Sequence, residues 1–268
     1  MSEESDLKPS TPPLTEPLNP AKTPRHWTRM VDSLMPERLC QYCHGLSQNG
    51  SLCQACLQVL TDRQPRCYQC ALPLLSQSHD DHRSCGECLS KPPAFERSVT
   101  AGSYQPPINH WLNNFKLRRN LRDGHLLYQL LLAQIERLYR GQALPKLLIP
   151  VPLHCSRLFL RSFNQSAWLA RQLQKSLRID TLNGISRSSS GRAQKRLNRR
   201  QRQHNLNGVF HIKPLALSIL RGQHVALIDD VVTTSATARV ISQQLIDAGA
   251  TRVDIWCLAR TDKTGFQH

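Results

Sequence analysis

The stretch HVALIDDVVTTSAT (224–237) decides the fold of this 268-residue chain. Its first half is apolar and ends in two adjacent acids, which is typical of a buried parallel strand that reaches the edge of a sheet. Small hydroxyl residues follow, and TTSATARVISQQLIDAGA (233–250) then has the pattern of a helix. A strand, a polar loop and a helix in this order predict an open α/β sheet with a ligand at the carboxyl end of the strand.

Strands and helices alternate along the rest of the C-terminal part, which favours a mostly parallel sheet flanked by helices. Further strands are predicted at SVTAGSY (98–104), KLLIPVP (146–152) and TRVDIWCLAR (251–260). Helices are predicted at 108–118, at 121–139, at 163–177 and around 193–204. The spacing of apolar residues predicts two buried helix faces: Leu127, Leu130, Leu131, Ile135 and Leu138 on the second helix, and Phe163, Ala167, Ala170, Leu173 and Leu177 on the third.

The acids and hydroxyls of the opening stretch are candidate ligand-binding groups. Two adjacent carboxylates can accept hydrogen bonds from the vicinal hydroxyls of a ribose, or hold a Mg²⁺ beside it. The loop after them opens a helix, whose free N–H groups and positive dipole end suit a phosphate. The alternative is a helix whose acids only cap it. We therefore expect a ribose 5-phosphate site formed by Asp229, Asp230, Val232, Thr233, Thr234, Ser235, Ala236 and Thr237.

Eight of the ten cysteines form four C-x-x-C pairs. Each pair places two thiolates at the spacing that a tetrahedral zinc ion needs, and two pairs complete a Cys₄ site. We expect about two structural zinc ions, one for each of two groups in sequence order: Cys40, Cys43, Cys53 and Cys56, then Cys67, Cys70, Cys85 and Cys88. Crossed pairing, or a thiolate replaced by His44, His79 or His82, stays open at this stage.

The N-terminal part predicts the compartment and the domain organisation. Residues 1–30 are rich in Pro, Ser, Thr and Glu and predict a disordered tail without a secretory signal. No run of apolar residues is long enough to span a membrane, so we expect a cytoplasmic chain without membrane insertion. The tail is followed by a Cys-rich zinc module at 31–92, which VDSLMPERL (31–39) opens as a short helix or turn. An α/β domain at 93–268 completes the chain.

Positive charge is concentrated in the middle of the chain. Residues 99–221 carry 21 Lys and Arg against 3 acids, whereas the flanking segments are close to neutral. Within this segment, residues 187–208 carry seven basic side chains and no acid. Such a surplus predicts an anionic partner, either a polyphosphorylated small molecule or the backbone of single-stranded DNA. A solvated basic surface without a partner is the alternative.

Four motifs together resemble one family. HVALIDDVVTTSAT (224–237) is similar to the phosphoribosyl pyrophosphate signature of type I phosphoribosyltransferases. The C-x-x-C array, VPLHCSRLFLRSFNQSAWLA (151–170) and QKRLNRRQRQHNLNGVF (194–210) complete a resemblance to the ComF/GntX family of competence-type proteins, which covers about residues 38–261. The resemblance implies a type I phosphoribosyltransferase domain behind a double zinc ribbon, and a role in the uptake and use of external DNA.

The resemblance also assigns roles to single residues. It implies that Asp229 and Asp230 contact the ribose hydroxyls and that Val231–Thr237 hold the 5-phosphate. Arg161 and Lys116 match family positions near the pyrophosphate, and residues 187–208 match a mobile loop over the site. The chain departs from the family pattern at Ser162 and Ser235, which stand where glycine is usual. A side chain at such a position costs free energy if the backbone needs a positive φ.

Three functions follow as expectations. The first is a competence protein that binds phosphoribosyl pyrophosphate and acts on external single-stranded DNA, with DNA-processing proteins as partners. The second is an active Mg²⁺-dependent phosphoribosyltransferase with an unknown nitrogenous acceptor, and the third is a nucleotide-sensing regulator that binds without turnover. The two missing glycines favour binding over turnover, and the sequence leaves the choice open.

Overall fold

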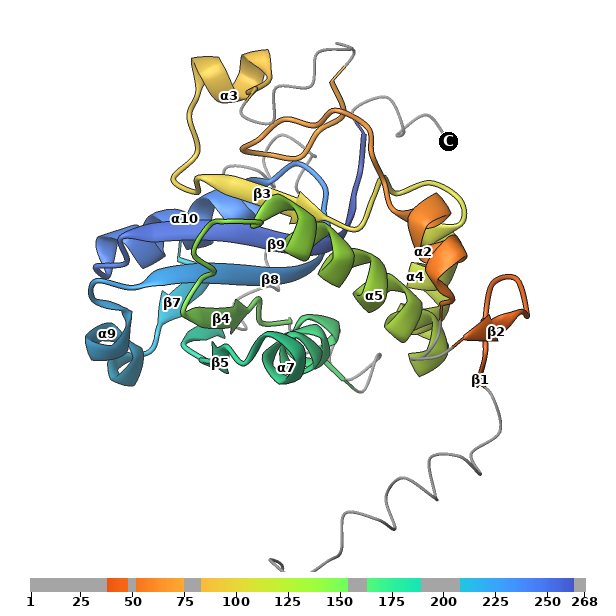
Figure 1. Cartoon of the computed structure of the whole chain (residues 1–268). Helices are drawn as coiled ribbons and strands as arrows, with labels where there is room; N and C mark the ends of the chain where they lie inside the picture. The colour runs from red at the N-terminus through yellow and green to blue at the C-terminus, as the bar shows by residue number, and fades with distance from the viewer. Residues whose placement is uncertain (1–37, 48–51, 75–82, 154–162, 189–207, 263–268) are drawn as a thin grey trace, which may run out of the picture. The chain divides into compact units, whose positions relative to one another are not determined.

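A five-stranded parallel sheet forms the centre of the computed structural model, which describes residues 38–47, 52–74, 83–153, 163–188 and 208–262 (Figure 1). The strand order is β3-β9-β8-β4-β5. The strands are β3 (Arg97–Thr100), β4 (Leu147–Pro150), β5 (Asp180–Thr181), β8 (His224–Val232) and β9 (Arg252–Arg260), and every pair is parallel. The predicted parallel sheet is therefore confirmed, although β3 ends at Thr100, four residues earlier than expected.

The two long central strands are buried on both faces. In β9 all residues after Arg252 are buried, and in β8 the run from Val225 to Ile228 is buried as well. Strands covered on both faces read as continuous apolar runs, which is why both could be recognised in the sequence. Their register pairs Asp229 with Cys257 and Val232 with Arg260, so the two strands end at the same edge of the sheet.

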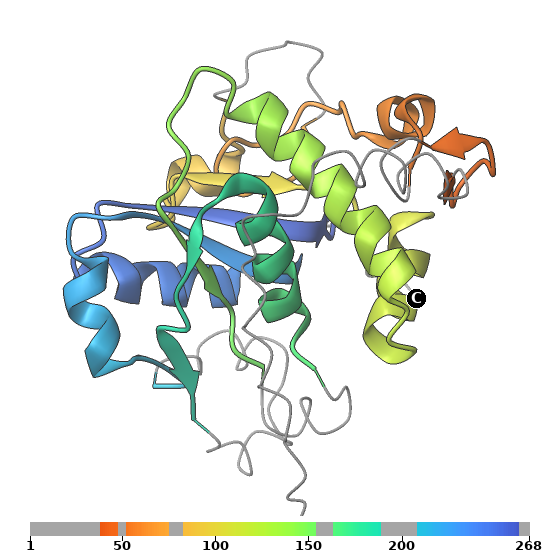
Figure 2. The same cartoon turned by 60° about the horizontal axis from the view of Figure 1, so that its bottom comes forward.

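Helices cover both faces of this sheet (Figure 2). On one face lie α4 (Ile108–Leu117), α5 (Leu121–Leu138) and α7 (Gln165–Leu177), and on the other lie α9 (Pro214–Leu220) and α10 (Ala236–Asp247). α4 and α5 pack closely because Gly124 has no side chain: a Cβ there would come within 2.7 Å of the Phe115 ring. Among the described residues, every helix is too short or too polar to span a membrane.

The buried face of α7 differs from the expectation. The structure buries Leu169, Ala170 and Leu173 completely, whereas Ala167 and Leu177 are only partly covered. The face therefore centres on Leu169, because α7 packs against β8 and β4 through the ridge that carries Leu169 and Leu173. On α5 the predicted face is confirmed, except that its last member, Leu138, is only partly buried.

Several short elements complete the described chain. β6 (Ile185–Arg187) pairs with β7 (Phe210–Ile212), and β1 (Arg38–Leu39) pairs with β2 (Leu46–Ser47), both antiparallel. Two short helices, α2 (Gln54–Leu60) and α3 (Gly86–Ser90), lie in the Cys-rich part. The helix or turn expected at 31–39 is corrected at its end, because Arg38 and Leu39 form a strand there. The helix expected around 193–204 lies outside the described residues.

A buried polar network lies at the start of β8 and β9, at the opposite edge from the strand ends. The fully buried Asp254 carboxylate accepts hydrogen bonds from the Tyr139 hydroxyl at 2.5 Å and from Arg252 Nε at 3.1 Å, and lies 2.7 Å from His224 Nε2. Burial raises the pKa of Asp254, but these hydrogen bonds stabilise the carboxylate more strongly and hold its pKa below the usual value. The ionised carboxylate therefore stabilises the fold.

Replacing Asp254 by Asn should destabilise the fold by about 3 kcal/mol at pH 7, because partners of a buried carboxylate are left unsatisfied. Since the native pKa lies below the unfolded one, this stabilisation is complete above about pH 4 and is lost as the pH falls through the native pKa. Urea unfolding at pH 7 and at lower pH measures the difference. Asp247→Asn, at an exposed carboxylate of α10, is the control. An Asp254→Asn penalty that stays constant down to pH 3 would contradict the assignment.

Candidate functional site

The carboxyl end of β8 carries the two predicted acids. Asp229 and Asp230 are both partly buried, and the Asp230 backbone N–H donates to Asp229 Oδ1 at 2.8 Å. Burial and, next, the neighbouring charge of Asp230 together raise the pKa of Asp229 to about 7, against the opposing effect of the backbone hydrogen bond. The raised pKa shows that the charge of Asp229 is only partly compensated by its surroundings.

Lys116 reaches the same place from the last turn of α4. Its Nζ lies 2.9 Å from Asp230 Oδ2, and both side chains are 13% exposed. The family resemblance implied that Lys116 lies near the pyrophosphate, and the structure brings it to the acid pair. Its partner there is a carboxylate. The pair is shielded enough from water for the interaction to be strong.

The loop after the acids forms a small hollow. Residues 233–235 connect β8 to α10, and the hollow of about 40 Å³ is lined by the loop and its neighbours, Asp229 and 231–238. Ser235 has φ +59°, the left-handed conformation that favours glycine. Its hydroxyl is buried and has no hydrogen-bond partner among the described residues. The suspected cost of a serine at this position is therefore real, yet the loop keeps its left-handed turn.

A larger cleft adjoins these groups. It has a volume of about 460 Å³. Lys116 from α4 and Arg187 from β6 contribute to its lining. The other lining residues lie at or after the carboxyl ends of β3, β4, β8 and β9: Tyr104, Gln105, Val151, Pro152, Leu153, Asp229, Asp230, Val231, Thr233, Thr237, Thr261 and Asp262. Because the sheet is parallel, all of its ligand-binding loops lie along one edge. The cleft is the candidate functional site.

Sequence reasoning missed three of the side chains that line this cleft. Tyr104 and Gln105 follow β3, and Asp262 follows β9. Gln105 Nε2 donates to Asp262 Oδ2 at 3.0 Å, so these two segments meet at the cleft. The rule that located Asp229, polar residues after an apolar strand, would also have found them had it been applied to β3 and β9.

Some predicted residues lie outside the described part of the chain. Arg161 and Ser162 fall in 154–162, and most of the predicted basic loop falls in 189–207. The residues just before the first of these segments do belong to the site, because Val151, Pro152 and Leu153 line the cleft. Asn164 then caps α7: its Oδ1 accepts from the Ser166 N–H at 2.9 Å, and its Nδ2 donates to the Val151 carbonyl at 3.1 Å.

The eight paired cysteines form two clusters in sequence order, as predicted. Within each cluster all four sulfurs lie within 4.8 Å of one another. Cys43 and Cys53 sulfurs are 3.7 Å apart and those of Cys70 and Cys85 are 3.6 Å apart, close to the separation of two thiolates on a tetrahedral zinc ion. Backbone N–H groups also point at several sulfurs, as they do around bound metals. The two sites fit structural zinc.

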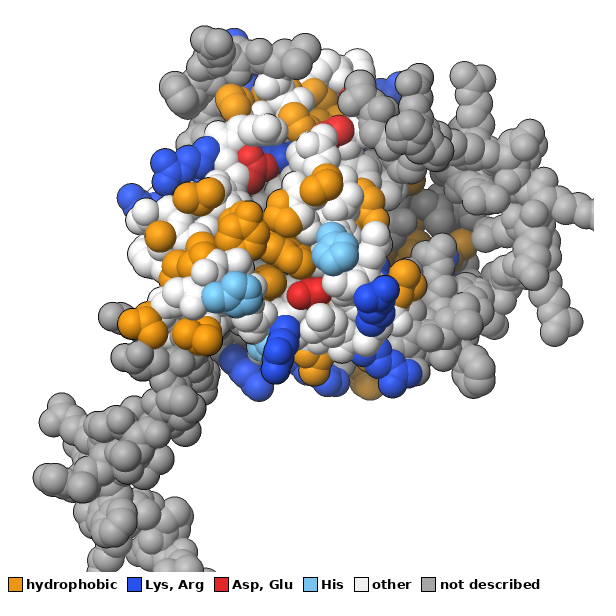
Figure 3. Space-filling model, turned by 90° about the vertical axis from the view of Figure 1, so that its right-hand side faces the viewer, with side chains coloured by type: hydrophobic (Ala, Val, Ile, Leu, Met, Phe, Trp, Pro, Cys, Tyr) orange, Lys and Arg blue, Asp and Glu red, His pale blue; other side chains and the backbone are white. Residues whose placement is uncertain are grey.

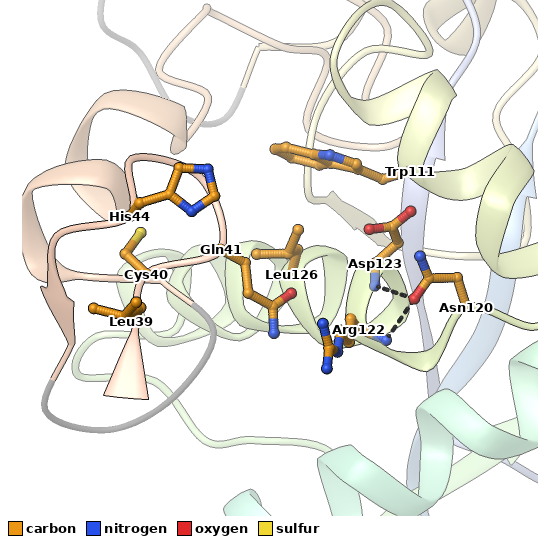
Figure 4. A pocket seen from close by; sticks show the side chains of 9 residues that line it. All are labelled: Leu39, Cys40, Gln41, His44, Trp111, Asn120, Arg122, Asp123 and Leu126. Atoms are coloured by element: carbon orange, nitrogen blue, oxygen red, sulfur yellow. Dashed lines mark hydrogen bonds between the residues drawn. The ribbon is translucent and has the colours of Figure 1, made fainter. Parts of the chain in front are cut away.

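A second pocket lies between the first cluster and the start of α5 (Figure 4). Its volume is about 320 Å³. Trp111 and Asp123 lie on one side and His44 on the other, and Asn120 accepts hydrogen bonds from the backbone N–H groups of Arg122 and Asp123. His44 is therefore not a member of the metal cluster beside it.

The surface around this pocket is both apolar and basic. Leu39, Tyr42, Leu46, Leu117 and Leu121 are 48–74% exposed. Figure 3 shows hydrophobic side chains gathered on this face, with Lys and Arg along its lower edge. The turn between α4 and α5 contributes Arg118 and Arg119, and the first turn of α5 contributes Arg122, all three exposed. Contiguous apolar and basic groups of this kind mark interaction surfaces.

Comparisons with known proteins extend over most of the chain. A model of the double zinc ribbon domain matches residues 30–89. The DNA utilization protein YhgH of Shigella flexneri is 34% identical over 226 residues, which cover 83% of this chain and 96% of that protein. Competence protein F of Haemophilus influenzae is 32% identical over 227 residues, which cover 82% and 96%.

Two solved structures match part of the chain. Purine phosphoribosyltransferase from Pyrococcus horikoshii matches with a TM-score of 0.30 and 18% identity, over 61% of this chain and 77% of that one. Glutamine phosphoribosylpyrophosphate amidotransferase from B. subtilis, complexed with ADP and GMP, matches with a TM-score of 0.34 and 20% identity. That match covers 55% of this chain and 27% of that one.

Replacing Ser235 by Gly should raise the free energy of unfolding by about 1 kcal/mol, because glycine adopts the left-handed conformation without strain and no hydroxyl is left unpaired. Ser242 is a matched control, since its hydroxyl is also buried and unpaired within the described residues, but its backbone is helical. Ser242→Gly should be destabilising by a similar amount. Denaturant unfolding of both variants measures the two changes in the free energy of unfolding. Equal destabilisation by the two substitutions would refute backbone strain at Ser235.

Proposed function

Because this chain belongs to the ComF/GntX family of competence and DNA utilization proteins, we propose that its cleft binds phosphoribosyl pyrophosphate and serves the use of external DNA. One observation carries the proposal. Asp229 and Asp230 stand at the end of β8 immediately before the 233–237 loop, and both groups line one cleft. Acceptors for a sugar diol and a cradle for a phosphate are thus adjacent.

Each part of the ligand finds a matching group. The ribose hydroxyls donate to the two carboxylates, and the 5-phosphate takes the backbone N–H groups of the loop at the N-terminus of α10. The left-handed Ser235 preserves the turn on which this cradle depends. The pyrophosphate lies toward Lys116 and the 151–153 segment, with a Mg²⁺ that neutralises part of its charge. Arg161 is assigned to the pyrophosphate by the family resemblance alone.

Lys116 changes partner in this proposal. It neutralises Asp230 at 2.9 Å, so the acid pair is partly compensated by the protein itself. A ribose hydroxyl bound at the carboxylate would take the place of this contact, and the Lys116 ammonium group would then be available to the pyrophosphate. Catalysis in such a site consists of positioning and charge neutralisation, without a covalent nucleophile from the protein. Binding is the proposal, and turnover with a nitrogenous acceptor is a separate outcome of its test.

The surface around the second pocket supports a second role, contact with single-stranded DNA. Arg118, Arg119 and Arg122 offer cations for phosphates, and the half-exposed Tyr42 ring offers a stacking face. Tyr42 is held by an edge-to-face contact with the buried Trp111, with ring centroids 6.0 Å apart. A fixed aromatic ring beside a basic turn is the arrangement that binds a nucleic-acid strand without reading its sequence.

Asp229→Asn combined with Asp230→Asn should weaken phosphoribosyl pyrophosphate binding about 100-fold, because two charge-assisted hydrogen bonds are lost. Isothermal titration with Mg²⁺ measures the change, and circular dichroism checks the fold. A variant with Asp180→Asn and Asp247→Asn is the matched control, since it removes two exposed carboxylates elsewhere. Unchanged affinity in a folded Asp229 and Asp230 variant would sink the proposal. Pyrophosphate release in the presence of candidate bases separates a transferase from a binding protein.

Arg118→Ala combined with Arg122→Ala should flatten the dependence of log K for single-stranded DNA on log salt by about 1.4, since each phosphate contact contributes about 0.7. Arg171→Ala combined with Lys175→Ala removes two exposed charges from α7 and should leave the slope unchanged. Fluorescence anisotropy with a labelled oligonucleotide at several salt concentrations provides the slopes. If both variants lower the slope equally, the contact is unspecific charge and this surface has no defined role. The same test on Arg196, Arg199, Arg200 and Arg202 addresses the basic loop.

A further inference from the structure

Arg260, the last residue of β9, joins three parts of the molecule. It is 3% exposed. Its Nε donates to the Cys70 carbonyl at 2.8 Å, and its Nη1 donates to the carbonyls of Val232 at 3.1 Å, of Thr233 and of Thr261 at 2.9 Å. Cys70 is a member of the second cysteine cluster, while Val232 and Thr233 begin the phosphate loop. A single guanidinium therefore bridges the metal site and the ligand site.

The buried guanidinium of Arg260 requires hydrogen-bond acceptors for its N–H groups. A guanidinium stays charged even when buried, and its partners here, among the described residues, are neutral carbonyls. A buried charge without satisfied hydrogen bonds is costly, so each carbonyl is needed. By holding the Val232 and Thr233 carbonyls, Arg260 fixes the peptide planes at the entry of the loop. Its positive charge also lies next to the place where the loop would receive an anion.

The Cys70 carbonyl is in place only while the second cluster is folded. The segment that carries it has few apolar residues of its own, and it is attached to the sheet by hydrogen bonds from Ser98 to the carbonyls of Tyr68 and Gln69. The buried members of this cluster, Cys67, Cys70 and Cys88, belong to the same core as β8 and α10. Small modules of this composition depend on their metal for folding.

We propose that zinc in the second cluster sets the geometry of the phosphate loop through Arg260, so that metal occupancy and affinity for a 5-phosphate are coupled. Loss of the metal releases the Cys70 carbonyl, and the guanidinium then gives up its fixed hold on Val232 and Thr233. Arg260 is a positioning residue in this scheme. The affinity part rests on the proposed function, whereas the change in loop geometry does not.

The first cluster provides an internal contrast. It belongs to the other core, with α4 and α5, and its described bond to the domain runs from the Leu52 N–H to Gln129 Oε1 at 3.0 Å. Within the described residues, no bond joins this cluster to the phosphate loop. Cys53 and Cys85 are a matched pair across the two clusters, because each is partly exposed and each precedes a short helix as its N-cap.

Cys85→Ser and Cys53→Ser should therefore differ. We expect Cys85→Ser to weaken ribose 5-phosphate binding about tenfold, and Cys53→Ser less than about twofold, because one hydrogen bond to a charged group is at stake in only one of them. Hydrogen exchange of the amides at 232–237 should rise in Cys85→Ser without any ligand. Hydrogen exchange separates the coupling from the proposed function, because it needs no ligand. If the unaltered protein fails to bind ribose 5-phosphate, only the proposed function is refuted. Equal effects of the two substitutions on exchange would overturn the coupling.

A cycle with Arg260→Lys tests the route. Lysine keeps the charge but cannot reach all four carbonyls, so it should weaken binding about tenfold by itself. If the metal acts through Arg260, adding Cys85→Ser to Arg260→Lys should cause less than about a twofold further loss. Independent effects would instead multiply to about 100-fold, and that result would refute the route through Arg260.

The unaltered protein offers a test that needs no variant. Coupling between two sites is reciprocal, so ribose 5-phosphate should raise the equilibrium affinity of one zinc site of two, measured by competition with a chromophoric chelator, and leave the other unaffected. We expect the affinity for the protected ion to rise about tenfold. Elemental analysis beforehand should find about two zinc ions per chain. Protection of both ions, or of neither, in protein that binds ribose 5-phosphate would contradict the proposal.

Discussion

The parallel pairing of β8 with β9 is the constraint on which the rest of the structure depends. Both strands are buried on both faces, and their register sets Val232 opposite Arg260. The carboxyl edge of the sheet therefore carries the acid pair, the 233–235 loop, Arg260 and Asp262 at one level. A shift of either strand would move the loop away from the guanidinium that holds it and would leave buried polar groups unsatisfied.

The cysteine clusters are built into this arrangement. Each cluster contributes buried thiols to a different hydrophobic core, the first with α4 and α5 and the second with β8 and α10. A small module without its own core gains stability from such contacts, and the domain gains a wall for its second pocket. The second cluster also contacts the carboxyl edge of the sheet, through the hydrogen bond from Arg260 to the Cys70 carbonyl.

The two carboxylates in the cleft are only partly compensated by the charges around them. The protein holds two carboxylates next to each other, offsets one with Lys116, and leaves the other with a pKa raised to about 7 by burial and by its neighbour. At the far edge of the sheet, by contrast, Asp254 has enough donors to remain ionised. Satisfied charge at one edge supports the fold, and incompletely compensated charge at the other is typical of a functional site.

The sequence by itself determined the elements and the chemistry that adjacent residues share. β8, β9, α4, α5 and α10 follow from apolar runs and periodicity, and the C-x-x-C spacing predicted two Cys₄ clusters, whereas the structure settled how the four pairs combine. Only the tertiary structure decided which distant groups meet. The contact of Arg260 with Cys70 spans 190 residues, and the contacts of Lys116 with Asp230 and of Gln105 with Asp262 are similarly remote in sequence. Periodicity encodes which face of an element is buried, but it carries no information about its neighbour, and so the centre of the α7 face and the hold on the phosphate loop could be seen only once the chain was folded.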